Sequence, residues 1–384
     1  MIETQVRPAV APAWRRAALP SVMAGFWPLL AGRAIVIGSL ALARFLVTDT
    51  RITSAKAVAA AHAGLLGWDA AWYRHIAAHG YAATGKGALR FFPLLPLLAR
   101  AVSVLPGVSV GAALLAISTI GTWAALALVH RLVLFETRSS SQALFAVWIV
   151  ALGPAAFVLV MGYAEPLLIA LSAATFLLAR TRRFAWAAAP ALLAGLCRPV
   201  GLLLALPLLI EGLRERRSVS AGGWAARAVA VLAAPAGAVA YLAWAAPLSG
   251  SFLYPLSEQL SPRHRGGVAD PVATLWHDAS DLAHRVHYGT ALHAPFAVVL
   301  VALAIVAFVK WPSSYGAYAA LTLAVALSAP NLDSLERYGL ACFPFALALS
   351  SVARRRQLRW AILAGSAALL VGYSLLAFLG AYVP

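Results

Sequence analysis

Long apolar runs recur along the whole chain and are separated by short clusters of arginine. Of the 384 residues, 62% are hydrophobic and 11% are charged, and the mean hydropathy is +0.83. Soluble domains carry about 25% charged residues, and runs of this kind are typical of helices that cross a bilayer. The sequence therefore predicts an all-α, polytopic integral membrane protein in which residues 1–384 form a single transmembrane domain.

The apolar runs predict about 11 transmembrane helices. They cover residues 26–48, 108–134, 144–162, 165–179, 185–197, 200–211, 224–248, 291–310, 314–329, 338–352 and 360–382. The runs 185–197 and 200–211 are short for full spans. We expect a helical pair broken at Arg198-Pro199, because proline disfavours helix at the residue before it. The stretch 91–106 is predicted to be an interfacial or re-entrant helix.

The arginine clusters set the predicted orientation. With the N-terminus in the cytoplasm, including Arg15 and Arg16, the later clusters also fall on the cytoplasmic side, as the positive-inside rule expects. These clusters are Arg180, Arg182 and Arg183; Arg214, Arg216 and Arg217; and Arg354, Arg355, Arg356 and Arg359. The isoelectric point near 10.8 therefore indicates the lipid bilayer as a partner, and no nucleic acid.

Most acidic residues and histidines then fall on the extracytoplasmic side. They lie in the loops 49–107, 162–166, 249–290 and 330–337. The first loop is large enough for interfacial helices, and residues 267–290 are polar enough for a loop helix. The positive-inside rule does not account for histidines, so we expect an extracytoplasmic active site. Richness in alanine and arginine fits a GC-rich bacterial genome and favours a multi-pass protein of the cell membrane.

The stretch GWDAAWYRHIAAHGY, residues 67–81, gathers polar and aromatic side chains in the first of these loops. On a helix, one face carries Trp68, Asp69, Trp72, Tyr73, His75, Ile76 and His79. Tryptophan and tyrosine at a bilayer boundary can simply anchor a helix. An acid fits that role poorly, whereas large apolar rings raise the pKa of a carboxyl group and suit it to act as a base. Asp69 is therefore the candidate catalytic base.

Five motifs carry a resemblance to a known family. WDAAWYRHIAAHGY, followed by RFFPLLPLL, resembles the W-D-x-x-W/Y-x-x-I-A-x-x-G-Y…F-F-P-L-x-P-L signature of the PIG-V-like mannosyltransferases. These are GPI mannosyltransferase 2 and its bacterial relatives, within the GT-C superfamily. Further along, GPAAFVLVMGYAEPLLIAL is similar to the family's N-P-x-x-x-F…Y-S-E-x-L-F segment, and LCRPVGLLL to its S-x-x-R-x-x-G. SEQL…ADPVATLWHDASDL resembles its Q…P…W loop, and LERYGLACFPF its R-Y-x-L-x-x-F-P.

The resemblance implies a GT-C-like fold and a membrane glycosyltransferase with an inverting mechanism. The implied donor is a polyprenyl-phosphate sugar, with mannose as the expected sugar, and the acceptor hydroxyl would belong to a glycolipid or a protein. The resemblance also assigns the role of base to Asp69. The chain departs from the pattern at Gly153, where the family often has asparagine, and at Ala164, which replaces a serine. Either departure is compatible with an altered donor or acceptor.

The matched positions supply the remaining candidate residues. Arg337, Arg198 and Tyr338 are predicted to bind the donor phosphate or its lipid, because a guanidinium presents a planar fork to phosphate oxygens. The predicted substrate-binding residues are Trp68, Trp72, Tyr73, His75, His79, Tyr163, Glu165 and Gln259. Alternatives stay open for two of the arginines: Arg198 can pair with Glu165, and Arg337 can form a salt bridge at a helix end.

The histidines raise the question of a metal. His75 and His79 are four residues apart, and His277, His284 and His287 lie in a later external loop, so a divalent metal is conceivable. No loop carries a tight ligand motif with a supporting acid. We therefore predict no metal and no other cofactor.

Two further groups are predicted to have no role in the site. Arg263, His264 and Arg265 read as a solvated loop that contacts anionic lipid headgroups. Cys197 and Cys342 lie in apolar surroundings, so neither a disulfide framework nor a thiolate metal site is expected.

Two other functions are compatible with the sequence. Another GT-C activity, such as transfer of arabinose from a polyprenyl carrier, would use the same kind of site. A non-enzymatic lipid or solute transporter would also contain intramembrane polar residues, but at mid-membrane on broken helices and often with an internal repeat. Here most polar residues lie in the predicted external loops, and no repeat of fixed period is apparent.

Overall fold

The computed structural model describes residues 18–49, 54–214, 219–261, 264–284, 293–330, 332 and 334–382. Every secondary-structure element in these residues is a helix, so the described part of the chain is all-α, as predicted. Some predictions concern residues outside these ranges, namely Arg15, Arg16, Arg216, Arg217, Arg263 and His287.

A helix occupies each of the predicted apolar runs. These helices are α2 (Ala18–Asp49), α7 (Val110–Thr137), α8 (Ser140–Leu152), α9 (Glu165–Arg180), α10 (Phe184–Cys197), α11 (Ala205–Leu213), α12 (Ala221–Ser249), α16 (Ala294–Lys310), α17 (Ser313–Leu327), α19 (Pro344–Val352) and α20 (Arg356–Phe378). Four of them, α2, α7, α12 and α20, are long and apolar enough to cross a bilayer alone. The chain therefore has the character of an integral membrane protein. The 14 residues of α10 reach only about 21 Å, against roughly 30 Å of hydrocarbon.

Two of the predicted runs are interrupted, and each interruption lies in a segment that carries or leads to candidate site residues. The run 144–162 ends its α-helix at Leu152 and continues as the short helix η3 (Ala156–Leu159), and the run 338–352 is divided between α18 (Leu335–Ala341) and α19. Predicting these runs as continuous helices was wrong. A proline lies at each break, at positions 154 and 344, and proline disfavours helix immediately before it.

The break predicted at Arg198-Pro199 is confirmed. α10 ends at Cys197, Arg198 is extended with φ −154° and ψ 153°, and the helix η4 (Pro199–Leu204) leads into α11. The chain turns so tightly that a Cβ at Gly201 would overlap the carbonyl oxygen of Ala194. The backbone of Arg198 is thus held away from the helical path at the end of α10.

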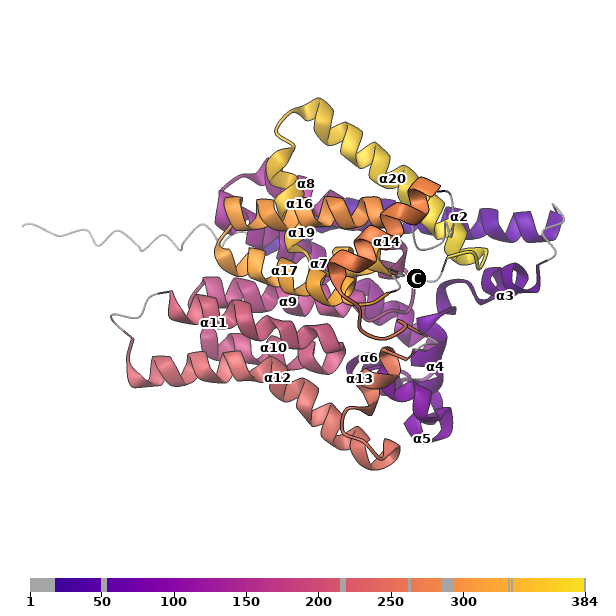
Figure 1. The fold of residues 1–384 in the computed structure, drawn as a ribbon, viewed down its shortest axis with the longest axis horizontal. Helices are drawn as coiled ribbons and strands as arrows, with labels where there is room; N and C mark the ends of the chain where they lie inside the picture. The colour runs from indigo at the N-terminus through magenta and orange to yellow at the C-terminus, as the bar shows by residue number, and fades with distance from the viewer. Residues whose placement is uncertain are drawn as a thin grey trace, which may run out of the picture.

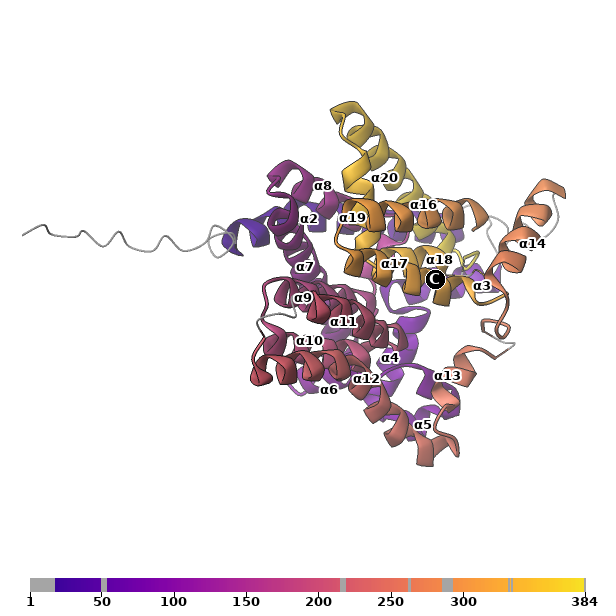
Figure 2. The same cartoon turned by 60° about the vertical axis from the view of Figure 1, so that its left-hand side comes forward.

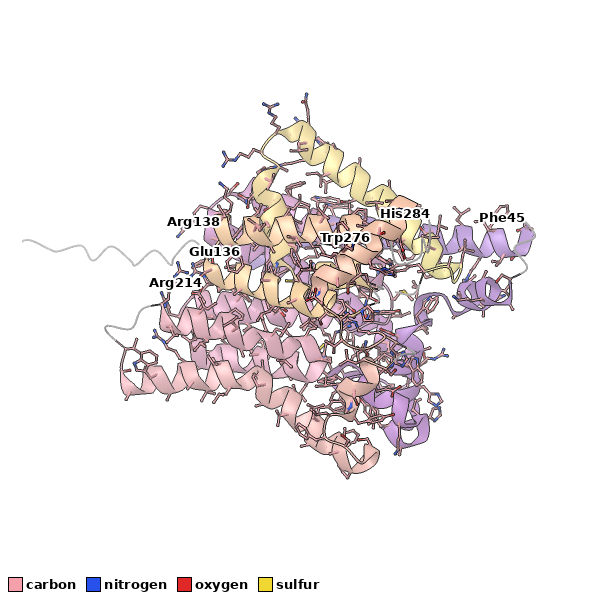
Figure 3. All side chains as sticks on the ribbon, in the orientation of Figure 1. Phe45, Glu136, Arg138, Arg214, Trp276 and His284 are labelled. Atoms are coloured by element: carbon pink, nitrogen blue, oxygen red, sulfur yellow. The ribbon has the colours of Figure 1, made fainter. Side chains whose placement is uncertain are left out.

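The helices of the predicted extracytoplasmic loops gather at one end of the molecule. Figure 1 shows α9, α10, α11 and α12 side by side, with the helices of the predicted external loops at their right-hand end. These are α3 (Ala55–Ala63), α4 (Asp69–His79), α5 (Tyr81–Thr84), α13 (Tyr254–Gln259) and α14 (Pro271–His284). The turned view in Figure 2 again places α3, α13 and α14 on one side. Arg138 and Arg214 lie at the opposite end (Figure 3). Segments predicted to share a side of the membrane therefore share an end of the molecule.

The stretch predicted as an interfacial or re-entrant helix forms the short helix α6 (Leu94–Val102), which packs against α4 and α7. Leu95 is buried, whereas Leu97 is 59% exposed. An apolar side chain on each face suits a helix that lies between protein and lipid. Through its contacts with α4, this helix supports the segment that carries Asp69.

The arginine-bearing end is closed by a buried ionic network. Arg180 on α9 lies 2.6 Å from Glu136 on α7 and 2.9 Å from Glu211 on α11. From α17, Tyr315 donates to Glu136 over 2.8 Å and Ser314 donates to Glu211 over 2.7 Å. The network joins four helices at the end away from α4.

Glycines allow α10 and α12 to pack closely. A Cβ at Gly195 on α10 would overlap the carbonyl oxygen of Ala234, and one at Gly237 on α12 would overlap that of Leu192. Small residues are the usual means by which membrane helices approach one another. This contact fixes the end of α10, and with it Arg198.

The close contact between α10 and α12 predicts that adding one methyl group there will lower the stability of the fold. Gly195→Ala should destabilise the fold by about 1–3 kcal/mol through overpacking and lower the thermal unfolding midpoint in detergent. Gly365→Ala is the matched control: Gly365 is also helical, and a Cβ there meets nothing within 4 Å. It should be neutral or stabilising by up to about 1 kcal/mol. Equal midpoints for the two variants would contradict the packing argument.

The separation of the two ends predicts opposite labelling in cells. Ala83 on α5 and Arg355 before α20 are both exposed, and the native cysteines Cys197 and Cys342 are buried. Ala83→Cys should react with an impermeant thiol reagent in intact cells, whereas Arg355→Cys should react only after permeabilisation. The reverse pattern would invert the orientation.

Candidate active site

A cavity of about 510 Å³ lies where the loops predicted to be extracytoplasmic meet the helix ends. Its lining is aromatic and basic, and it comes from segments far apart in the sequence. The lining residues are Trp68, Asp69, Trp72, Tyr73, Arg90, Phe91, Phe92, Arg198, Pro199, Val200, Leu256, Gln259, Leu260, His264, Arg265, Val325, Ser334, Arg337 and Tyr338.

Most of the site residues predicted from the sequence come together here. Those that line the cavity are Trp68, Asp69, Trp72, Tyr73, Arg198, Gln259, Arg337 and Tyr338. Tyr163 and Glu165 are buried beside it and contact its lining. His75 and His79 belong to the same helix but are exposed and outside the lining. The structure therefore gives no support to their predicted contact with substrate.

Ionic contacts link the two acids and two of the arginines. Arg337 Nη1 lies 2.9 Å from Asp69 Oδ2, and Arg337 Nε lies 2.8 Å from Glu165 Oε1. Arg198 Nη1 contacts the same Glu165 oxygen. For Arg198, the alternative of pairing with Glu165 is therefore the one observed. For Arg337, the alternative of a salt bridge at a helix end is also the one observed, and it extends to both carboxylates.

The centre of this ionic cluster is buried, and Asp69, with 21% of its side chain exposed, is the acid that faces the cavity. The side chain of Arg337 is 8% exposed and that of Glu165 is 1% exposed, and the Arg337 guanidinium lies 5.3 Å from the centre of the Tyr163 ring. The Tyr163 hydroxyl accepts a hydrogen bond of 3.3 Å from the backbone N–H of Asp69. Removing one partner of a buried pair costs about 3–5 kcal/mol because the other charge is left uncompensated. The cluster is therefore a strong restraint on the position of Asp69.

Backbone strain occurs immediately before both helices that carry the cluster. Trp68 has φ 54° and precedes α4, and Ser334 has φ 70° and precedes α18. A side-chain-bearing residue with positive φ costs of order 1–3 kcal/mol and persists where its surroundings fix it. The Trp68 indole N–H donates to the carbonyl oxygen of Ala377 over 3.0 Å. The strain helps to set Asp69 and Arg337 at the beginnings of their helices.

Glu336, the neighbour of Arg337, anchors α18 from its other side. It accepts hydrogen bonds from His293 Nδ1 at 2.7 Å, from the Tyr373 hydroxyl at 3.1 Å and from the Tyr382 hydroxyl at 3.1 Å. Glu336 and His293 are both buried. These bonds tie α18 to the start of α16 and to α20, so Arg337 is presented by a helix that is fixed on two sides.

Two arginines of the cavity were missed by the sequence reasoning. Arg265 was predicted to be solvated, but it is 9% exposed and donates to the carbonyl oxygens of Val325, over 3.2 Å, and Ala326, over 2.7 Å. That prediction was wrong because the end of α17 covers this loop. Arg90 lines the cavity without having been singled out. The position of Arg90 directly before the F-F-P motif was the one feature of the sequence that could have indicated a role in the site.

The described residues contain no group of three or more His, Cys, Asp or Glu side chains able to hold a metal. The rings of His75 and His79 lie 4.7 Å apart, and His277 lies on α14, 3.7 Å from Asp281. The prediction that neither a metal nor another cofactor takes part remains a prediction.

No protein-family model matches this sequence, and no curated protein matches it significantly. The resemblance to the PIG-V-like family therefore rests on the motifs alone. The site itself offers a carboxylate for proton transfer, arginines for an anion, and aromatic faces such as the stacked rings of Trp72 and Phe91, 5.6 Å apart.

The ionic cluster predicts that two damaging substitutions will partly compensate each other. Arg337→Gln should destabilise the protein by about 3–5 kcal/mol, because Asp69 loses its buried partner while Glu165 keeps Arg198. Adding Asp69→Asn removes the uncompensated charge and should restore about 1–3 kcal/mol. Thermal unfolding of the two single variants and the double variant in detergent measures this coupling. Strictly additive effects would show that the Arg337–Asp69 contact contributes nothing.

Proposed function

We propose that the protein is a GT-C-type membrane glycosyltransferase with about eleven transmembrane helices. It transfers a sugar, mannose in the first instance, from a polyprenyl-phosphate donor to a hydroxyl of a glycolipid or protein at the extracytoplasmic face of the cell membrane. One observation carries the proposal: Asp69 is the carboxylate in the described lining, and it is fixed by Arg337 in a cavity of arginines and aromatic rings. That combination suits a base next to an anionic leaving group.

In the proposed inverting reaction, the acceptor oxygen attacks C1 of the sugar. The C1–O bond to the phosphate breaks with its electron pair, and the polyprenyl phosphate departs as an anion. Asp69 takes the proton of the acceptor hydroxyl. Oδ2 accepts the hydrogen bond from Arg337, which leaves Oδ1 for this proton. The hydroxyl becomes strongly acidic as its oxygen bonds to C1, so a carboxylate suffices to take its proton.

The charges around Asp69 suit this chemistry. Arginines in a cavity of low dielectric stabilise the negative charge that develops on the departing phosphate. A phosphate leaves without a strong general acid, so a second catalytic carboxylate of the kind used by most glycoside hydrolases is not required. Glu165, which contacts both Arg198 and Arg337, is then a structural partner and not a second acid.

Asp69→Asn provides the direct test. Asparagine keeps the shape and can still accept a bond from Arg337, but it cannot take a proton, so turnover should fall by roughly 10²–10⁴. The readout is consumption of polyprenyl-phosphate mannose by purified protein supplied with membrane lipid extract, with the arabinose donor in a parallel reaction. Asp270→Asn is the matched control, since Asp270 is exposed and caps α14 through backbone N–H groups.

The outcomes separate the candidate functions. Activity of Asp69→Asn within a few-fold of wild type would place the base elsewhere. Consumption of the arabinose donor alone would support the proposed glycosyl transfer and show that the sugar is arabinose instead of mannose. Failure of the wild-type protein to consume either donor would reject the proposal and leave transport as the function to examine.

A further inference from the structure

The arginines of the cavity differ in how their charges are compensated. Arg337 lies against Asp69 and Glu165, and Arg198 lies against Glu165. Within the described ranges, Arg90 has no carboxylate at ion-pair distance, and its buried Nε makes no hydrogen bond. Two of the arginines are thus already engaged by acids, whereas the charge of Arg90 is available to a ligand.

Arg90 is held in place by aromatic rings. Its guanidinium carbon lies 4.5 Å from the centre of the Phe91 ring and 5.7 Å from that of Trp72. Those two rings stack on each other at 19°. A guanidinium against ring faces keeps its N–H groups for other partners, since the contact uses the π surface. The side chain is therefore ordered without its donors being consumed.

The backbone on both sides of Arg90 is also fixed. The Tyr241 hydroxyl donates to the carbonyl oxygen of Leu89 over 2.7 Å, and the Tyr81 hydroxyl donates to that of Phe91 over 2.7 Å. Burial lowers the pKa of Arg90, because the cation is poorly solvated there, and the more distant carboxylates of Asp69 and Glu258 only partly oppose this shift. An anion in the cavity would stabilise the charged form. Fixing a cation in this way before the ligand arrives reduces the ordering cost of binding.

Arg265 adds a second charge without an acidic partner. Its Nη1 and Nη2 donate to backbone carbonyls and its buried Nε makes no hydrogen bond in the part of the chain that is described. Carbonyl oxygens satisfy donors but carry no net charge. The four arginines of the lining outnumber the nearby carboxylates of Asp69, Glu165 and Glu258, so the cavity keeps a positive potential.

We propose that Arg90 binds the phosphate of the polyprenyl-phosphate substrate, with Arg265 supplying additional positive potential. Arg337 and Arg198 instead hold the carboxylates, and Arg337 is the positioning residue for Asp69. This assignment rests on the proposed function, and it replaces the expectation that Arg337 and Arg198 form the phosphate clamp. With this assignment, the residue that binds the phosphate belongs to the first of the predicted external loops.

The test compares two probes that differ only in the phosphate. Binding of farnesyl phosphate and of farnesol to the full-length protein in lipid nanodiscs is measured by calorimetry. Wild type should prefer farnesyl phosphate, and Arg90→Gln should reduce that preference about ten- to a hundred-fold. Arg90→Lys should lie between them, because a point charge replaces the fork. Arg74→Gln, an exposed arginine of α4 outside the cavity, is the matched control.

The double variant Arg337→Gln/Asp69→Asn makes the comparison decisive. It removes the Arg337 charge without leaving Asp69 ionised, and it should keep the preference for farnesyl phosphate. Wild-type preference in Arg90→Gln, or its loss in the double variant alone, overturns the assignment. Absence of any preference in wild type overturns it together with the proposed donor. If the Arg90-dependent preference is present but no polyprenyl-phosphate sugar is consumed, the phosphate site stands and glycosyl transfer is rejected.

Discussion

The contact between Arg337 and Asp69 joins two points 268 residues apart in the sequence, and the cavity depends on it. Arg337 can contact Asp69 and Glu165 at the same time only if α4, α9 and α18 are all in place. In surroundings of low dielectric, a misplacement of either carboxylate leaves a charge without a partner. Total folding stability is about 5–15 kcal/mol, so one such error consumes a large part of it.

Apolar patterning predicted where the helices lie and little about how they connect. Hydrophobic runs locate helical segments because any helix in a bilayer must be apolar. They do not show where a helix stops inside an apolar run. A single proline accompanies each of the interruptions after Leu152 and before Pro344. A proline alone does not predict a break, because apolar helices also tolerate proline, as at Pro190 in α10. The break at Arg198 was predictable because a charge and a proline coincide there.

The motifs predicted the centre of the candidate site better than its edges. Asp69, Arg198 and Arg337 each lie at a helix end within an otherwise apolar chain, where a charge requires a partner. A helical projection of residues 68–80 gave a face that was too wide, since it cannot show where a cavity ends, and so it included His75 and His79. The burial of Arg265 depends on carbonyls at the end of α17, and no local pattern reports such a contact.

The separation of the ionic partners along the sequence has a consequence for biosynthesis. Arg198 follows Glu165 by 33 residues, whereas Arg337 follows Asp69 by 268. At ribosomal speeds of about 5–20 residues per second, Asp69 waits roughly 13–54 s for its cation, while Glu165 is neutralised almost at once. The hydrogen-bond acceptor of Trp68, at Ala377, is translated later still. During this interval the carboxylate of Asp69 has to be compensated by water, because its cation has not yet been made.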